Sequence, residues 1–221
     1  MKFELKQLNN NIFVLTFDDQ YDLAMHFLRW SEFAESTDDK IRGTHFKILD
    51  FIESYAKSHK NSFSYPSDWA GFNLSSRVFS QYPWDAIPDP NQYDAFMKKV
   101  VSFIYQVTAG DPFYLIGHVT GQDDIVDHEM AHAMYDRNTE YMKQAGILMN
   151  KIPEKNYLDL WNAIVDMGYP ESVVRDEMQA YLSTGLIAVL RRAFMTHRIP
   201  KKTTKPFEAL FKKYKEELLD D

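Results

Sequence analysis

The order of element types along this chain constrains its fold more than any other feature. Segments rich in β-branched and aromatic residues occur only before residue 120, at 2–8, 11–17 and 113–119, and such segments predict strands. Beyond them the apolar residues follow only helical spacing. Strands in one part of a chain and helices in the other are typical of an α+β protein. The sequence therefore predicts a small mixed sheet in the N-terminal half and a largely helical C-terminal half.

Helices are expected wherever apolar residues recur at three- and four-residue spacing. Asp18 or Asp19 is placed to cap the first helix, which runs to about Glu35. The segment 61–90 reads as irregular, with one helical turn near 75–81. The other helices are expected at 45–58, 91–108, 123–136, 138–150, 154–167, 171–183, 186–195 and 206–219. The apolar stripe of the 91–108 helix is assigned to Tyr93, Phe96, Val100, Phe103, Ile104 and Val107.

Two turns are predicted from residue type. The segment Asn9–Asn11 lies between the first two strands, and Asn tolerates the positive φ that tight turns use. Gly117 and Gly121 are expected to bracket the turn that leads from strand 113–119 into helix 123–136.

Length and composition narrow the class of protein. A chain of 221 residues, 45% of them apolar, suits one domain over 1–221, with a mixed α/β part at about 1–122 and a helical part at about 123–221. A formal charge of −7 argues against nucleic acid as a partner. The chain contains no cysteine, so any metal site has to use histidine and carboxylate ligands.

The N-terminus and the hydropathy bear on location. Acidic and basic residues interrupt Met1–Lys6, so this segment lacks the apolar core of a signal peptide. No apolar run approaches the ~20 residues that a membrane span needs. These patterns predict a soluble, cytoplasmic protein without a membrane partner, although a secretion signal of another kind would leave no trace in them.

His128, Glu129 and His132 form the pattern H-E-x-x-H within the expected helix 123–136. Positions i and i+4 lie one turn apart on one helix face, so two imidazoles there converge on a single ion. Zinc lowers the pKa of a bound water to about 7, and the adjacent carboxylate of Glu129 is placed to accept that proton. The alternative interpretation is a helix with two partly exposed histidines and no metal.

Two histidines leave such a site one ligand short, because catalytic zinc takes three protein ligands and a water. The third histidine of the metzincin pattern is missing after His132. Glu177, on the expected helix 171–183, is the preferred third ligand. The alternative interpretation is that Glu177 is a solvated carboxylate on the surface of that helix. The rival ligands are Asp136, Glu140 and Glu171.

With Glu177 in this role, the two motifs resemble the gluzincin branch of the zincin metallopeptidases. In that family a downstream helix supplies a glutamate ligand, often inside an acidic or Asn-Glu pair, and Asp176–Glu177 is similar to such a pair. The resemblance covers roughly residues 113–185. The family's common Asp four residues after the ligand is Tyr181 here, a departure that places the imidazole-orienting role at this position in doubt.

The resemblance implies a zincin-like fold and one Zn²⁺ ion held by His128, His132 and Glu177. It implies hydrolysis of peptide or protein substrates with Glu129 as the general base. By the same resemblance, strand 113–119 would border the cleft as an edge strand and pair with extended substrate. The plain alternative for that segment is a core strand.

A transition state that develops negative charge on oxygen also needs a hydrogen-bond donor opposite the metal. Tyr169 lies shortly before Glu177, where gluzincins often place a tyrosine, and Tyr181 lies one turn after Glu177. His118 and His197 are further candidates. For each of these residues, a packed aromatic or a surface histidine is the favoured interpretation.

Three functions remain open from the sequence. A zinc peptidase and a zinc hydrolase of a non-peptide amide use the same chemistry at the metal. A non-catalytic protein with a structural zinc is the third, and the presence of Glu129 argues against it, since a closed structural site needs no base. A fourth class, a nucleic-acid module, rests only on a basic stretch and conflicts with the net charge of −7; such a stretch is more typical of a solvated connector, and it could also contact an acidic partner. The stretch comprises Arg191, Arg192, Arg198, Lys201, Lys202 and Lys205.

Overall fold

The computed structural model describes residues 2–185 and 201–220, and the chain divides into two compact units, Met1–Val126 and Asp127–Asp221. The first unit is mixed α/β and the second is helical, as the sequence predicts. The expected helix 186–195 lies outside the described residues, and so do Arg191, Arg192 and Arg198 of the basic stretch.

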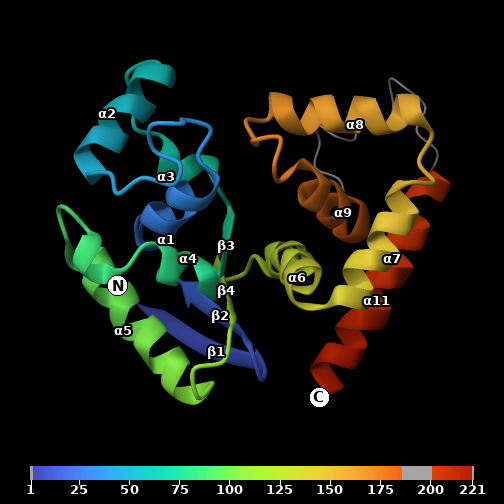
Figure 1. Cartoon of the computed structure of the whole chain (residues 1–221), viewed down its shortest axis with the longest axis horizontal. Coiled ribbons are helices and arrows are strands. Elements are labelled where there is room, and N and C mark those ends of the chain that lie inside the picture. The colour runs from blue at the N-terminus through green and yellow to red at the C-terminus, as the bar shows by residue number, and fades with distance from the viewer. Residues whose placement is uncertain (1, 186–200, 221) are drawn as a thin grey trace. The chain divides into compact units, whose positions relative to one another are not determined.

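The first unit is built on a four-stranded mixed sheet (Figure 1). Its order is β1-β2-β4-β3, with antiparallel β1/β2 and β3/β4 pairs and a parallel β2/β4 pair. The strands are β1 Phe3–Asn9, β2 Ile12–Phe17, β3 Gly71–Ser75 and β4 Tyr114–Val119. The predicted small mixed sheet in the N-terminal half is therefore confirmed.

The turn between β1 and β2 forms differently from the prediction. The described non-glycine residues with positive φ are Lys60, Asn61 and Ala109, so the segment Asn9–Asn11 contains none. The Asn9 side chain instead accepts hydrogen bonds from the backbone N–H groups of Asn11 (3.1 Å) and Ile12 (2.8 Å). Asn closes this turn through its side-chain oxygen rather than through a left-handed backbone.

Strand β3 lies inside the segment that the sequence marks as irregular. Its burial alternates, with Phe72 and Leu74 turned inward, which is the period of a half-buried strand. Because β3 pairs with one edge of β4 and β2 pairs with the other, β4 is an interior strand. The expectation that segment 113–119 pairs with substrate as an edge strand is therefore wrong.

Helix α1 (Gln20–Glu35) covers this sheet and is capped by Asp19, whose side chain accepts from the backbone N–H of Asp22 at 3.0 Å. It packs against β2, β3 and β4. A Cβ atom at Gly117 would lie 2.5 Å from the Phe27 ring. The prediction that Gly117 lies in a turn is therefore wrong: it lies in β4, where its missing side chain lets α1 pack closely. Gly121 (φ +83°) does lie in the turn, as predicted.

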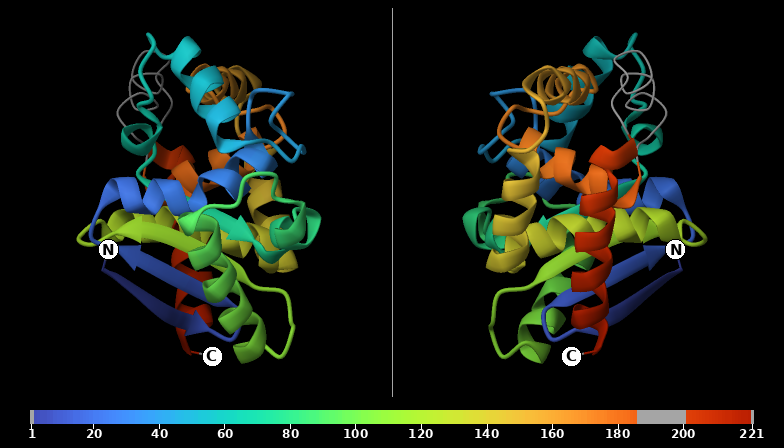
Figure 2. Two further views of the ribbon diagram at one scale, coloured as in Figure 1. Left: turned by 90° about the vertical axis from the view of Figure 1, so that its left-hand side faces the viewer. Right: turned by 90° about the vertical axis from the view of Figure 1, so that its right-hand side faces the viewer.

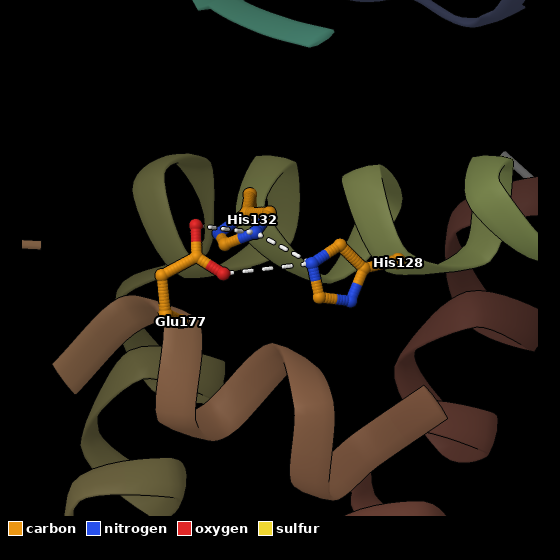
Figure 3. A group of neighbouring side chains, drawn as sticks. All are labelled: His128, His132 and Glu177. Atoms are coloured by element: carbon orange, nitrogen blue, oxygen red, sulfur yellow. Dashed lines mark hydrogen bonds and ion pairs between the residues drawn. The ribbon is translucent and has the colours of Figure 1, made fainter. Parts of the chain in front are cut away.

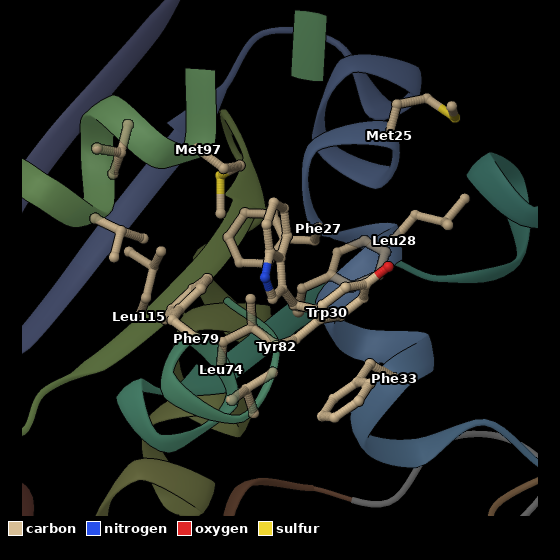
Figure 4. Close-up of a cluster of buried hydrophobic side chains, with 14 of the residues drawn as sticks. Met25, Phe27, Leu28, Trp30, Phe33, Leu74, Phe79, Tyr82, Met97 and Leu115 are labelled. Atoms are coloured by element: carbon tan, nitrogen blue, oxygen red, sulfur yellow. The ribbon is translucent and has the colours of Figure 1, made fainter. Parts of the chain in front are cut away.

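Helix α5 (Gln92–Val107) begins with a capping box formed by Asn91 and Asp94. Phe103 and Val107, predicted on its buried stripe, are 53% and 44% exposed. The remaining helical segments of this unit are α2 Ile48–Ser58, α3 Tyr65–Asp68, α4 Ser76–Gln81 and the 3-10 turn η1 Trp84–Ala86. Figure 4 shows the core, to which α1 contributes Met25, Phe27, Leu28, Trp30 and Phe33.

The second unit is a set of helices centred on α9 (Val174–Thr184), which packs against α8 (Glu154–Asp166) and α11 (Lys205–Asp220). Helix α11 also packs along α7 (Thr139–Met149), and both stand close together in the views of Figures 1 and 2. Helix α6 (Asp123–Arg137) enters this unit at Asp127, and a 3-10 turn, η2 (Lys201–Thr203), precedes α11. Within the described residues, no helix combines the length and apolarity required to cross a bilayer.

Candidate metal centre

Helix α6 carries the H-E-x-x-H motif and holds it on a firmly packed element. Met130, Ala131, Ala133 and Met134 are buried, which fixes the rotation of the helix about its axis. Asn138 follows its end and caps α7 by accepting from the backbone N–H groups of residues 140 and 141. The two imidazoles therefore lie one turn apart on the same side of a helix, as i, i+4 spacing requires.

Glu177 brings the third side chain from the first turn of α9 (Figure 3). The Nε2 atoms of His128 and His132 lie 3.3 Å apart. Glu177 Oε1 lies 3.5 Å from His132 Nε2, and Glu177 Oε2 lies 3.6 Å from His128 Nε2. Within the described part of the chain, this is the one group of three potential metal-binding side chains whose ligand atoms all lie within 4.8 Å of one another.

These distances fit a tetrahedral zinc ion. Ligand atoms at 2.0–2.2 Å from such an ion are separated by about 3.3–3.5 Å, the edge of the tetrahedron. The separation of 3.3 Å between the two imidazole nitrogens matches that edge, and each nitrogen has one of the two Glu177 oxygens at a similar distance, 3.5 or 3.6 Å. His132 and Glu177 are almost wholly buried, and the side chain of His128 is 16% exposed.

The electrostatics of the group favour a cation. Glu177 Oε2 is buried and has no hydrogen-bond partner among the described residues. Burial lowers the pKa of His132, but Asp176 and Glu177 raise it more strongly, so this pKa stands well above its usual value. Two imidazole nitrogens and a carboxylate thus face one another, an arrangement that a positive charge between them stabilises.

Each imidazole is oriented through its other nitrogen. Asp176 Oδ1 lies 2.9 Å from His132 Nδ1 and accepts its proton, which leaves Nε2 free to bind a metal. Thr184 Oγ1 lies 3.4 Å from His128 Nδ1 and donates its own proton to the Ala180 carbonyl at 2.8 Å. The Thr184 oxygen can therefore accept from His128. Both histidines present the nitrogen that faces Glu177.

The rival ligands are not part of the group. Asp136 is absent from the cluster of converging ligand atoms. Glu140 lies on exposed helix surface of α7 and accepts a hydrogen bond from Gln144 at 2.9 Å. Glu171 is an exposed residue of the turn before α9. Of the candidate carboxylates, Glu177 is the one that meets both histidines.

Glu129 is buried on α6, 6% exposed, beside the histidine pair. Its negative charge contributes to raising the pKa values of His132, Tyr169 and Tyr181, so all three lie near this carboxylate. A carboxylate next to the ligand atoms but outside the ligand group is what a general base requires.

Tyr169 and Tyr181 form a hydroxyl pair near the ligand group, with 3.1 Å between their oxygens. The Tyr181 ring packs against the His128 ring, with 4.4 Å between centroids and a tilt of 43° between the ring planes. Burial first, and Glu177 next, raise the pKa of both phenols. The hydroxyls therefore keep their protons at neutral pH and remain donors.

Of the two histidines proposed as donors to the oxyanion, one lies in the first unit and the other lies outside the described residues. His118 lies on β4 in the first unit, where its Nε2 is 2.9 Å from Thr16 Oγ1 on the neighbouring strand β2. His197 lies outside the described residues.

Comparison with protein-family models, curated proteins and solved structures found no match to this chain. The functional argument therefore rests on the geometry of the site. Two contributors were missed in the sequence: Thr184, and Asp176, which appears there only as part of an acidic pair. The spacing of Asp176 and Thr184 from Glu177 places them on the same helix, but their partners lie on α6, and that contact has no signal in a single sequence.

Proposed function

We propose that this protein is a zinc-dependent hydrolase of the gluzincin type, with a zincin-like fold, that cleaves peptide bonds. The observation that carries the proposal is the convergence of His128 Nε2, His132 Nε2 and the Glu177 carboxylate: the two nitrogens lie 3.3 Å apart, and each has one of the two Glu177 oxygens at 3.5 or 3.6 Å. Glu129, buried beside this group, supports a catalytic rather than a structural metal, because a closed structural site has no use for a base.

Each residue has a distinct task in the proposed reaction. His128, His132 and Glu177 hold the metal, and a bound zinc ion supplies Lewis acidity toward water and the scissile carbonyl. Glu129 accepts the proton of the attacking water and delivers it to the leaving amine. Its burial excludes competing water from that proton transfer.

The tyrosine pair supplies the donor for the developing oxyanion. Of two hydroxyls 3.1 Å apart, one donates to the other and the second keeps a proton free to donate elsewhere. Because both phenols keep their protons at neutral pH, the pair can donate to negative charge on a substrate oxygen. Removal of one such donor typically costs about 10²–10³-fold in turnover.

The test compares Glu129→Gln with the wild type for zinc content and peptide cleavage. Glutamine is nearly isosteric and removes only the basic oxygen, so we expect stoichiometric zinc, unchanged stability and a loss of turnover of about 10²–10⁴-fold. Glu140→Gln is the matched control, since Glu140 is an exposed glutamate of the same unit outside the ligand group. Equal turnover of Glu129→Gln and wild type would refute the mechanism.

The substrate is sought with a peptide library and by following self-cleavage on storage. A wild-type protein that binds zinc but cleaves no peptide would transfer the proposal to a non-peptide amide, whose hydrolysis uses the same residues. Failure to bind zinc at all would overturn it.

A further inference from the structure

Beyond the ligands, one fully buried side chain links three helices of the second unit. Gln179 on α9 has no exposed surface. Its Nε2 donates to the Asp176 carboxylate at 2.9 Å and to the Ala131 carbonyl on α6 at 3.2 Å. Its Oε1 accepts from the Tyr141 hydroxyl on α7 at 2.9 Å. Both donor hydrogens of the amide and its oxygen are thus used.

Two of these contacts act on the metal site. Asp176 Oδ1 accepts from Gln179 Nε2 and also from His132 Nδ1, so the glutamine fixes the oxygen that orients the imidazole. Ala131 immediately precedes His132 in the H-E-x-x-H motif, so the second contact fastens the motif to the helix that carries Glu177.

The third contact fixes the amide itself. Tyr141 is wholly buried, and its hydroxyl donates to Gln179 while lying 3.3 Å from Ser183 Oγ. Its ring meets the Tyr214 ring of α11 edge-on at 5.5 Å. The Gln179 oxygen accepts from Tyr141, and its nitrogen donates to Asp176. A 180° flip of the amide would place its oxygen against the Asp176 carboxylate, so this orientation is fixed.

We infer that Gln179, oriented by Tyr141, is a positioning residue that sets the distance between α6 and α9 and the orientation of His132, and so the metal affinity of the site. This inference rests on the proposed function. Outer partners of this kind typically change metal affinity by about 10–100-fold when removed.

The experiment measures zinc affinity by chelator competition and records the Co²⁺ absorption spectrum, which reports ligand geometry. Gln179→Met keeps the length of the side chain and removes all three hydrogen bonds, and we expect about 10–100-fold weaker zinc binding and an altered Co²⁺ spectrum. Gln144→Met is the matched control: Gln144 also donates to two side chains, Glu140 and Tyr214, but touches no residue of the site. It should leave both readouts unchanged.

A double-mutant cycle separates positioning from general destabilisation. If Gln179 acts through Asp176, adding Gln179→Met to Asp176→Ala should weaken zinc binding much less than it does in the wild type. Tyr141→Phe leaves the ring in place and should give the same spectral change to a smaller extent, and it carries the test if Gln179→Met does not fold. Wild-type zinc affinity and Co²⁺ spectrum in the folded variants would overturn this inference while the proposed function stands. Absence of zinc binding by the wild type would overturn the proposed function itself.

Discussion

Both units bury charged side chains, but they satisfy them in opposite ways. In the first unit, Arg29 of α1 is 1% exposed and is surrounded by acceptors from its own chain. In the second, Glu177 is similarly buried and faces two imidazole nitrogens, with one carboxylate oxygen left without a hydrogen bond among the described residues. The first arrangement uses every donor, whereas the second leaves a buried acceptor oxygen that a metal ion would take.

The Arg29 network shows what a closed site looks like. Its Nε and Nη2 donate to the two oxygens of Asp94 at 2.9 and 3.1 Å, and Nη1 donates to the Phe46 carbonyl at 2.8 Å. The remaining N–H groups reach Tyr82 and Asp89. All five donors of the guanidinium are used, which is what burying such a group requires.

The difference teaches how to distinguish a structural cluster from a candidate site. A buried ion pair is a weak indication of function when donors and acceptors match. A buried carboxylate oxygen without a hydrogen bond, in a group that converges at the spacing of metal ligands, points instead to a candidate site. The comparison thus predicts that metal binding stabilises the second unit, whereas substitution of Arg29 lowers the stability of the first unit.

The largest effect is expected from removing the histidine ligands. His128→Ala and His132→Ala should each abolish zinc binding, because a two-ligand remnant holds zinc poorly. Zinc content after dialysis, measured by elemental analysis, should fall from about one ion per chain to none. Stoichiometric zinc in the double variant would show that these histidines do not hold the metal, and the contrast with the Arg29 network would be lost.

The next effect concerns Glu177. Glu177→Ala should weaken zinc binding by more than the about 100-fold typical of an outer partner, since it removes a direct ligand. Asp136→Ala is the matched control, because Asp136 lies on the same helix as the histidines but outside the ligand group, and it should leave the affinity near the wild-type value. Chelator competition measures both, and the reverse order would assign the third ligand to Asp136.

Much of this site follows from local spacing. The i, i+4 histidines could be predicted because helix geometry fixes which side chains share a face, whereas Glu177 was expected from its acidic pair and from the resemblance to gluzincins. The contacts of Asp176 with His132 and of Gln179 with Tyr141 could not, since each joins helices distant in the sequence.

The fold shows the same limit. Caps and periodicity placed most of the described helices to within a few residues, as for α1, which ends at the predicted Glu35, but the short helix α3 was missed. Strand β3 was missed, because the five residues Gly71–Ser75 carry too short an alternation to stand out among turn residues. The position of β4 inside the sheet depends on that missed strand, so the error on substrate pairing followed from it.

The third effect, on stability, tests the Arg29 network of the first unit. Arg29→Met leaves Asp94 buried without its partner, and we expect a loss of about 3–5 kcal/mol in the free energy of unfolding. Arg42→Met is the matched control: Arg42 pairs with Asp39 at the surface, and loss of an exposed pair costs about 0–1 kcal/mol. Urea denaturation measures both. Equal losses would show that burial does not distinguish the two arginines.

The smallest effect compares the buried imidazoles of the two units. Carboxylates raise the pKa of His132, whereas His26 of α1 is 2% exposed and packs on the rings of Phe17 and Phe96. Burial lowers the pKa of His26, and this outweighs the opposing influence of Asp22, whose carbonyl lies 2.6 Å from its Nδ1, and of Asp94.

The folded pKa of His26 lies below the unfolded value of 6.5. At pH values between the two, the unfolded chain therefore binds more protons than the folded chain. The stability that His26 contributes is therefore present above pH 6.5 and is lost as the pH falls through its folded pKa. Urea midpoints of metal-free protein between pH 7.5 and 5 should fall less steeply for His26→Leu than for the wild type, while exposed His59→Leu should follow the wild type. Parallel curves for His26→Leu and wild type would mean that the buried imidazole of the first unit is not held neutral, and the contrast with His132 would be lost.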